Sequence, residues 1–242
     1  PYFDLMYETV QSILAKSGHI NHKYLKESES DKKAVIVVTA NRGLAGGYNS
    51  NITRMIIDEG FTKENTVVYA VGKKGRELLE RKGYEIKADY SEAINEPIYK
   101  DAKEICDDVL SAFADGEVGE IYLAYTVFKN TVVHEPQLIR LLPVEADDAA
   151  HETDGSEALM TYEPSEEEAL DMIIPKYVCS LVYGALIESV ASENGARMQA
   201  MDSATSNAEE MISTLSLKYN RARQASITQE LTEIIAGANA IE

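Results

Sequence analysis

The chain has 242 residues, of which 45% are hydrophobic and 26% are charged, and its formal net charge is -18. This composition is typical of a soluble protein with one core or a domain plus an extension. The negative charge excludes nucleic acid and anionic lipid as main partners, because both require clustered Lys and Arg. With no export leader and no apolar run near eighteen residues, any membrane link is expected to come through a partner.

The first predicted element is the end of a helix, residues 1–17. Its apolar residues recur at three- and four-residue spacing, as on one face of a helix that ends near Gly18. These residues are Phe3, Met6, Val10 and Ile13. Since the sequence lacks an initiator Met, we expect this segment to be the remainder of a longer helix.

A globular α/β domain is predicted over residues 18–164. Continuous Val and Ile runs at 32–40 and 65–72 predict buried parallel strands, and the intervening patterns at 49–59 and 73–83 predict crossover helices. This arrangement indicates a small Rossmann-like unit with a mostly parallel sheet.

The rest of this domain is predicted to be a helix and two strands. The helix runs from about 96 to 114, and the strands cover 120–130 and 131–144. We expect these strands to be antiparallel, with Pro136 marking an edge or a bulge.

A single very long helix is predicted for residues 165–242. Ser165 and Glu168 have capping-box spacing, and no proline follows Pro175. At about 1.5 Å per residue, the part after Pro175 would extend roughly 100 Å, so most of it cannot pack on the sheet.

Within this helix a weak heptad seam predicts a coiled coil. The seam comprises Met198, Met201, Thr205, Ala208, Ile212, Leu215, Tyr219 and Ala222, and a shifted seam resumes at Ile227, Leu231, Ile234 and Ala238. Gly184 and Gly195 each cost about 1 kcal/mol relative to Ala. The helix therefore needs a partner, and the N-terminal helix is the obvious one.

A glycine-rich turn, VTANRGLAGGYNSNI, connects the first strand to the next helix. The spacing of Gly43, Gly46 and Gly47 matches neither a P-loop nor the G-x-G-x-x-G dinucleotide fingerprint. Lys73 and Lys74 could meet a 2'-phosphate, so nucleotide binding remains an alternative. We favour a structural role for the three glycines in a tight strand-to-helix turn.

No metal, cofactor or catalytic site is predicted. Cys106 and Cys179 are far apart in the sequence without C-x-x-C spacing and are interpreted as small buried hydrophobic residues. The histidines show no metal-ligand spacing and are interpreted as loop or surface residues: His19, His22, His134 and His151. The sequence also contains no recognisable motif of a catalytic nucleophile.

Two stretches closely resemble the gamma subunit of F-type ATP synthases. They are RGLAGGYNSN at 42–51 and the carboxyl-terminal SENGARMQAMDSATSNAEEMI with YNRARQASITQELTEIIAGANAI. The resemblance implies a Rossmann-like domain between two long helices that form an antiparallel coiled-coil rotor shaft. It also implies that most of the N-terminal helix is missing here, its end being PYFDLMYETV. That helix is basic in the family, so -18 overstates the charge of the whole subunit.

The function implied by this resemblance is mechanical, without catalysis or a cofactor in this chain. The shaft couples ion-driven rotation of the membrane c-ring to sequential conformational change at the catalytic sites of the alpha/beta ring. Implied partners are the alpha and beta subunits, the epsilon subunit and the c-ring, with one copy per complex at the cytoplasmic face of the bacterial plasma membrane. By motif match, the ring contacts are Arg223, Gln224, Thr228 and Glu230; alternatively they are solvated flanks of the seam.

The competing interpretation is a Rossmann-type nucleotide-binding enzyme with a coiled-coil oligomerisation tail. Such an enzyme would bind ATP or a dinucleotide and would self-associate, whereas a rotor subunit would do neither. A free coiled-coil adaptor is a third interpretation, but it leaves the specific carboxyl-terminal sequence unexplained.

Overall fold

The computed structural model describes residues 22–25, 30–144 and 166–239. These residues fall into two units, Pro1–Arg197 and Met198–Glu242, and each is described by itself. The predicted helix over 1–17 lies outside the described residues, and so does the predicted cap at Ser165.

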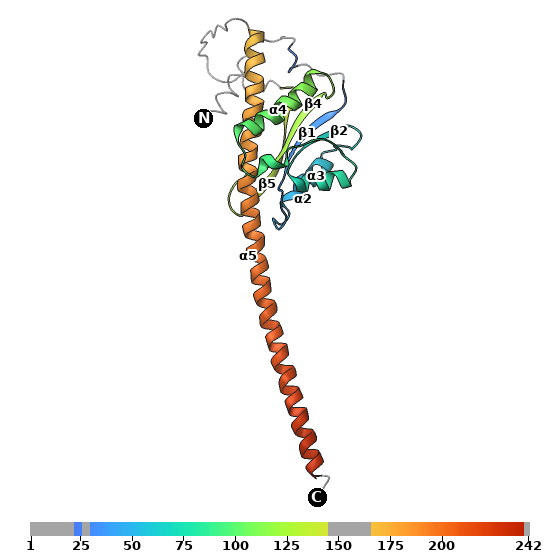
Figure 1. Ribbon diagram of the computed structural model, residues 1–242, viewed down its shortest axis with the longest axis vertical. Coiled ribbons are helices and arrows are strands. Elements are labelled where there is room, and N and C mark those ends of the chain that lie inside the picture. Colours follow the sequence, from blue (N-terminus) through green and yellow to red (C-terminus); the bar gives the residue numbers. More distant parts are fainter. Residues whose placement is uncertain (1–21, 26–29, 145–165, 240–242) are drawn as a thin grey trace, which may run out of the picture. The chain divides into compact units, whose positions relative to one another are not determined.

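The first unit contains a five-stranded sheet in the order β3-β2-β1-β4-β5 (Figure 1). All neighbouring strands are parallel except β4 and β5, which are antiparallel. The strands are β1 (Lys33–Val38), β2 (Thr66–Val71), β3 (Glu85–Asp89), β4 (Glu120–Phe128) and β5 (His134–Leu142). The predicted mostly parallel sheet with an antiparallel last pair is confirmed.

Helices cover both faces of this sheet. Because β1 and β2 are therefore buried on both sides, they are apolar at nearly every position. The helices are α2 (Tyr48–Asp58), α3 (Lys73–Arg81), α4 (Tyr99–Ala114) and α5 (Glu166–Asn239). Alternate residues of β1 belong to different core clusters: Ile36 packs with residues of α4 and α5, whereas Val37 packs with residues of α2 and α3. A strand buried on both faces needs a continuous hydrophobic run.

Sequence analysis missed the edge strand β3 and the short 3-10 helix η1 (Ser91–Ile94) that follows it. The β3 sequence EIKAD has a half-buried, alternating pattern, and only its Ile and Ala positions face the core. Five residues with three charges give too weak a hydrophobic signal for a strand. Pairing with β2 supplies the stability that the sequence of β3 does not show.

Asp89, at the end of β3, makes the stability of this edge depend on pH. Burial acts to raise the pKa of its carboxyl, but hydrogen bonds from Ser91 and the charge and hydrogen bond of Arg76 outweigh burial, so the pKa is lowered. A lowered folded-state pKa adds stability above the unfolded value of about 3.9, and this stability is lost as the pH falls through the folded pKa.

We expect Asp89→Asn to lower the free energy of unfolding at pH 7 by about 0.5–1 kcal/mol, because the ion pair with Arg76 is partly exposed. The difference between the wild-type protein and the variant should shrink as the pH falls below about 4. Urea unfolding at a series of pH values measures this difference. A difference that stays constant down to pH 2 would contradict the lowered pKa assigned to Asp89.

The helix α5 has 74 residues and continues through Pro175. It contains an eighteen-residue window of mean hydropathy 1.5, which corrects the expectation that the sequence has no such run. In the fold, 44% of this window is buried. By length and composition alone, one such helix is weak evidence for a membrane span.

Candidate functional site

The glycine-rich turn lies between β1 and α2 in the first unit. Gly46 has a φ of 55° and Leu44 has a φ of 64°, so two residues of the turn are in the left-handed region. Gly47 is the N-cap of α2, with a φ of -82°, and no side chain caps this helix. A Cβ at Gly43 would meet nothing within 4 Å. Of the three glycines, only Gly46 has a conformation that favours glycine.

The polar groups around this turn form hydrogen bonds and ion pairs with neighbouring groups of the chain. The Asn49 Oδ1 accepts a hydrogen bond from the Ala40 N–H at 2.8 Å. The Asn41 Oδ1 accepts one from the Lys73 N–H at 2.9 Å. The two lysines of the alternative nucleotide site have acidic neighbours, since Lys73 Nζ lies 3.7 Å from Glu92 and Lys74 Nζ lies 2.8 Å from Glu77. Because these polar groups already have partners within the chain, the contacts do not favour nucleotide binding at this turn.

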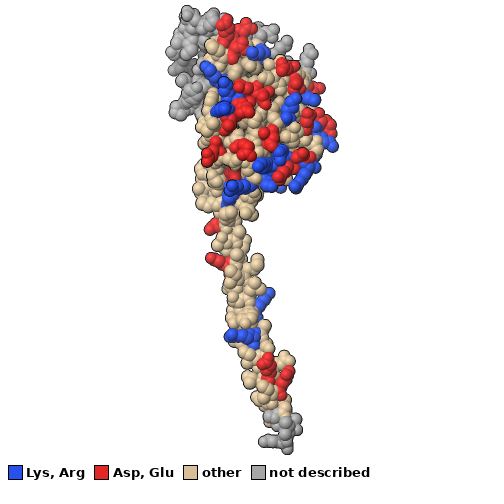
Figure 2. Space-filling model, viewed as in Figure 1, with Lys and Arg blue, Asp and Glu red and all other residues tan. Residues whose placement is uncertain are grey.

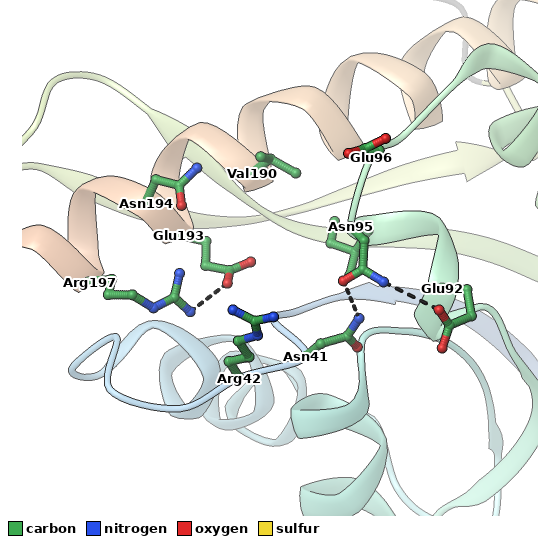
Figure 3. Close-up of a pocket in the computed structure, with 10 residues that line it drawn as sticks. Asn41, Arg42, Glu92, Asn95, Glu96, Val190, Glu193, Asn194 and Arg197 are labelled. Carbon is green, nitrogen blue, oxygen red and sulfur yellow. Dashed lines mark hydrogen bonds and ion pairs between the residues drawn. The ribbon is translucent and has the colours of Figure 1, made fainter.

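A polar cleft of about 590 Å³ lies beside the turn, between the loop after β1, the segment after β3, and α5 (Figure 3). Arg197 donates a hydrogen bond to Glu193 at 2.6 Å, and Figure 3 shows Arg42 between this ion pair and Asn41. The two arginines share the cleft with three glutamates, Glu92, Glu96 and Glu193, and its apolar lining is limited to Ile94 and Val190. The cleft therefore offers neither an aromatic platform for a base nor a net positive charge for phosphates.

Tyr48, the first residue of α2, anchors the turn to α5. Its hydroxyl donates a hydrogen bond of 3.0 Å to the backbone carbonyl of Ser189. The side chain is buried at 5% exposure, and this burial raises the pKa of the phenol above its ordinary value. Sequence analysis did not identify this contact, because a Tyr beside a glycine pair carries no signal for its distant partner.

We expect Tyr48→Phe to lower the free energy of unfolding by about 1–2 kcal/mol, because it removes a buried hydrogen bond and keeps the ring. The matched control is Tyr219→Phe, since the Tyr219 side chain is 66% exposed and the change keeps the ring that the proposed seam would pack, so it should have almost no effect. Urea unfolding of the two variants compares them directly. Equal stability of Tyr48→Phe and the wild-type protein would contradict the anchoring role.

The two cysteines, distant in the sequence, belong to the same core cluster in the structure. Cys106 of α4 is 2% exposed and Cys179 of α5 is 4% exposed. Their interpretation as small buried residues is confirmed.

The described histidines lie at the edges of the core. His22 is buried and lies 3.2 Å from the Asp171 carboxylate, whereas His134 packs against Phe128. His134 also touches α5, since a Cβ at Gly195 would lie 2.6 Å from its ring. Within the described ranges, no three side chains of the metal-binding types cluster as a metal site would require.

The second unit, taken by itself, is a stretch of α5 whose described side chains are exposed, except for the half-buried Ala200. Its charged residues are sparse (Figure 2). Large apolar side chains are exposed along it: Met198, Met201, Met211, Ile212, Leu215, Leu217, Tyr219, Ile227, Leu231, Ile234 and Ile235. An exposed apolar surface of this extent is typical of a protein interaction site.

The four predicted contact residues lie on this exposed stretch of helix. Because a helix turns 100° per residue, Arg223 and Glu230 lie within about 20° of one another, and Gln224 and Thr228 lie within about 40°. The two pairs point about 130° apart around the helix axis. All four side chains are exposed. The structure thus presents them to solvent as two separate pairs.

Comparison with known proteins gives concordant matches over essentially the whole chain. The family model described as ATP synthase matches residues 1–241. The ATP synthase gamma chain of Lachnoclostridium phytofermentans is 66% identical over 247 residues, covering 100% of this chain and 85% of that protein. The protein named ATP synthase gamma chain, sodium ion specific, of Acetobacterium woodii is 42% identical, again covering 100% of this chain and 85% of the relative.

Solved structures show the same fold at lower identity. A chain of the Euglena gracilis mitochondrial ATP synthase, solved as OSCP/F1/c-ring, aligns with a TM-score of 0.65 at 18% identity and covers 99% of this chain and 90% of its own length. A chain of the central stalk/c-ring structure of the Tetrahymena thermophila mitochondrial ATP synthase has a TM-score of 0.59 at 24% identity. That alignment covers 81% of this chain and 86% of the other.

Proposed function

This chain belongs to the ATP synthase gamma-chain family and is a non-catalytic stalk subunit of that enzyme, and from this premise we propose how it works. It acts as the rotor shaft that couples rotation of the c-ring to conformational change at the catalytic sites of the alpha/beta ring. The observation that carries the proposal is the 66% identity to a gamma chain over the whole of this sequence.

The exposed apolar side chains of the second unit support the shaft role. A lone helix with an apolar seam is marginal in water, so the seam requires a partner helix. The partner we propose is the N-terminal helix whose end is residues 1–17. Beyond the seam, residues 222–240 are rich in Ala, Ser and Thr. Small side chains suit a surface that must turn past a ring, because large buried apolar anchors would hold the shaft in one orientation.

Ring contact is proposed for the two residue pairs defined above. The guanidinium of Arg223 presents a planar fork of donors, which suits a bidentate contact with a carboxylate or backbone carbonyls. Gln224 and Thr228 supply amide and hydroxyl groups, and Glu230 supplies an acceptor. Together these groups offer scattered polar contacts that can be broken and re-formed during rotation.

We propose that the further partners are the epsilon subunit and the c-ring, with one gamma chain per complex. The ATP synthase is a membrane-associated complex, and we place this subunit at the cytoplasmic face of a bacterial plasma membrane through those partners. The sodium specificity in the name of the Acetobacterium woodii relative belongs to that protein. In the family the choice between protons and sodium ions lies in the c-ring and stator.

The test is to purify the endogenous full-length protein from its source membranes in mild detergent. We expect one copy with three alpha and three beta chains, together with ATP hydrolysis by the preparation. Native mass and subunit ratio are the measurements. A free protein, or a homo-oligomer that carries a nucleotide, would overturn the proposal and reopen the glycine-rich turn as a ligand site.

A further inference from the structure

An exposed apolar patch lies where the start of α4 meets α5. Ile98, the N-cap of α4, is 54% exposed, and Tyr99 is 47% exposed. The Tyr99 ring packs edge to face against the Tyr183 ring of α5, with the ring centroids 5.8 Å apart. Ile187 lies one turn beyond Tyr183 on α5 and is 45% exposed. These four residues, the α4–α5 patch, form a continuous apolar surface across two helices, which is typical of a docking site.

The segment that precedes His22 is tied to α5 at a distance from this patch. His22 is buried, and its Nε2 lies 3.2 Å from the Oδ1 of Asp171. The Nζ of Lys23 lies 2.8 Å from the same oxygen. The Nδ1 of His22 accepts a hydrogen bond from the Tyr24 N–H at 3.3 Å. These contacts fix the point from which residues 1–21 leave the described part of the chain.

The length of residues 1–17 matches the stretch of α5 between this tie and the patch. At about 1.5 Å per residue, a helix over 1–17 extends about 25 Å. By the same rise, the distance along α5 from Asp171 to Ile187 is about 24 Å. A helix over 1–17 that runs back along α5 from the His22 tie therefore reaches the α4–α5 patch with its first turns.

The apolar stripe of residues 1–17 has the spacing of one face of α5 taken in the opposite direction. Both sets recur at intervals of three, four and three residues. The stripe is Phe3, Met6, Val10 and Ile13, and the face of α5 is Ile187, Gly184, Ser180 and Tyr177. With Phe3 beside Ile187, each residue of the stripe has one residue of this face opposite it. Gly184 has no side chain, so Met6 opposite it can approach the α5 backbone closely.

We propose that the α4–α5 patch docks residues 1–17, with Phe3 against Ile187 and Met6 beside Tyr99. The start of α4 then forms a second contact surface for this helix, next to α5. The docking rests on the proposed shaft role, in which the N-terminal helix pairs with α5. It adds a direct contact between that helix and the globular domain, which holds the helix from a second side.

The first experiment measures whether the patch is covered, and it uses the purified full-length subunit without any other chain of the enzyme. A cysteine is introduced at Ile98 or, as the matched control, at Ser111, which is exposed on the same helix. The native cysteines stay in place because both are buried. We expect Ile98→Cys to react with N-ethylmaleimide at least about tenfold more slowly than Ser111→Cys, because the reaction requires the docked helix to open.

The second experiment identifies what covers the patch. Met6→Cys combined with Ile98→Cys should be joined by bis(maleimido)ethane in the same full-length subunit. Digestion with trypsin should then give a peptide that ends at Lys16 linked to residues 88–100, as mass spectrometry will show. Met6→Cys combined with Ser111→Cys is the matched control and should give little linked product.

Three outcomes would overturn the docking. The first is equal reactivity of Ile98→Cys and Ser111→Cys. The second is protection of Ile98→Cys that arises only after assembly with the other subunits, which would assign the patch to one of them. The third is protection without a cross-link from Met6→Cys. In each case, recovery of the chain in one copy with three alpha and three beta chains would leave the proposed rotor function standing.

Discussion

Replacing Gly72 with Ala will lower the free energy of unfolding by about 4 kcal/mol or prevent folding, because two costs combine at this position. Gly72 has a φ of 116°, which a residue with a Cβ rarely adopts. An added Cβ would also lie 2.1 Å from the Thr39 carbonyl oxygen and 2.6 Å from the Thr39 carbonyl carbon. Both are backbone atoms at the end of β1, so no side-chain rotation relieves the clash.

The surroundings of Gly72 explain why Thr39 cannot move away. The Thr39 N–H donates to the Val71 carbonyl at 2.7 Å, continuing the parallel pairing of β1 and β2. The Thr39 hydroxyl donates to the Gly72 carbonyl at 3.3 Å and accepts from the Gly75 N–H at 2.9 Å. Shifting Thr39 would therefore break buried hydrogen bonds in the centre of the sheet.

Gly60→Ala is the matched control for this prediction. Gly60 also has a positive φ, 82°, but a Cβ there would meet nothing within 4 Å. Only the conformational cost remains, and we expect a loss of about 1 kcal/mol. Urea unfolding of the full chain measures both variants. Similar losses for Gly72→Ala and Gly60→Ala would show that the contact with Thr39 has no energetic role.

Replacing Arg223 and Gln224 together with Ala is expected to reduce ATP hydrolysis by the assembled enzyme about tenfold or more. This prediction rests on the proposed ring contacts. A hydrogen bond to a charged group contributes about 1.5–3 kcal/mol, which corresponds to a factor of roughly ten to one hundred. Ala is the best helix former, so the shaft helix itself is preserved. Steady-state hydrolysis by the reconstituted complex, together with the yield of assembled complex, is the measurement.

The control for this pair is Lys218→Ala with Gln229→Ala, which also removes one cation and one amide. These residues are equally exposed on the same stretch of helix, but each lies about 80° or more around the helix axis from every one of the four proposed contact residues. The control variant should assemble and hydrolyse ATP at nearly the wild-type rate. Unchanged assembly and ATP hydrolysis in the variant that lacks the Arg223 and Gln224 side chains would contradict their proposed contact with the ring. An equal loss in the control would show that any charge on this helix serves the same purpose.

The family motifs also show what a local sequence pattern can indicate and what it cannot. The segment from Arg42 to Asn51 and the carboxyl-terminal segment around Arg223 are sufficient to indicate the gamma-subunit family from the residues alone. They do not show that Tyr48, within the first motif, bonds the backbone of Ser189 in α5. A motif records which residues occur together in a family, whereas the partner of a side chain depends on which distant segment packs against it.

By itself, the sequence determined the buried parallel strands, the antiparallel last pair and the length of α5, because each rests on a pattern of neighbouring residues. Continuous Val and Ile runs produce strands buried on both faces, and a proline-free stretch after Pro175 permits one helix. Only the tertiary structure decided that β3 pairs at the edge, that Gly72 must accommodate Thr39, and that Cys106 and Cys179 belong to one core cluster. Hydrophobic periodicity specifies which face of an element is buried, but not which distant element covers it; that is decided by the packing of the whole chain.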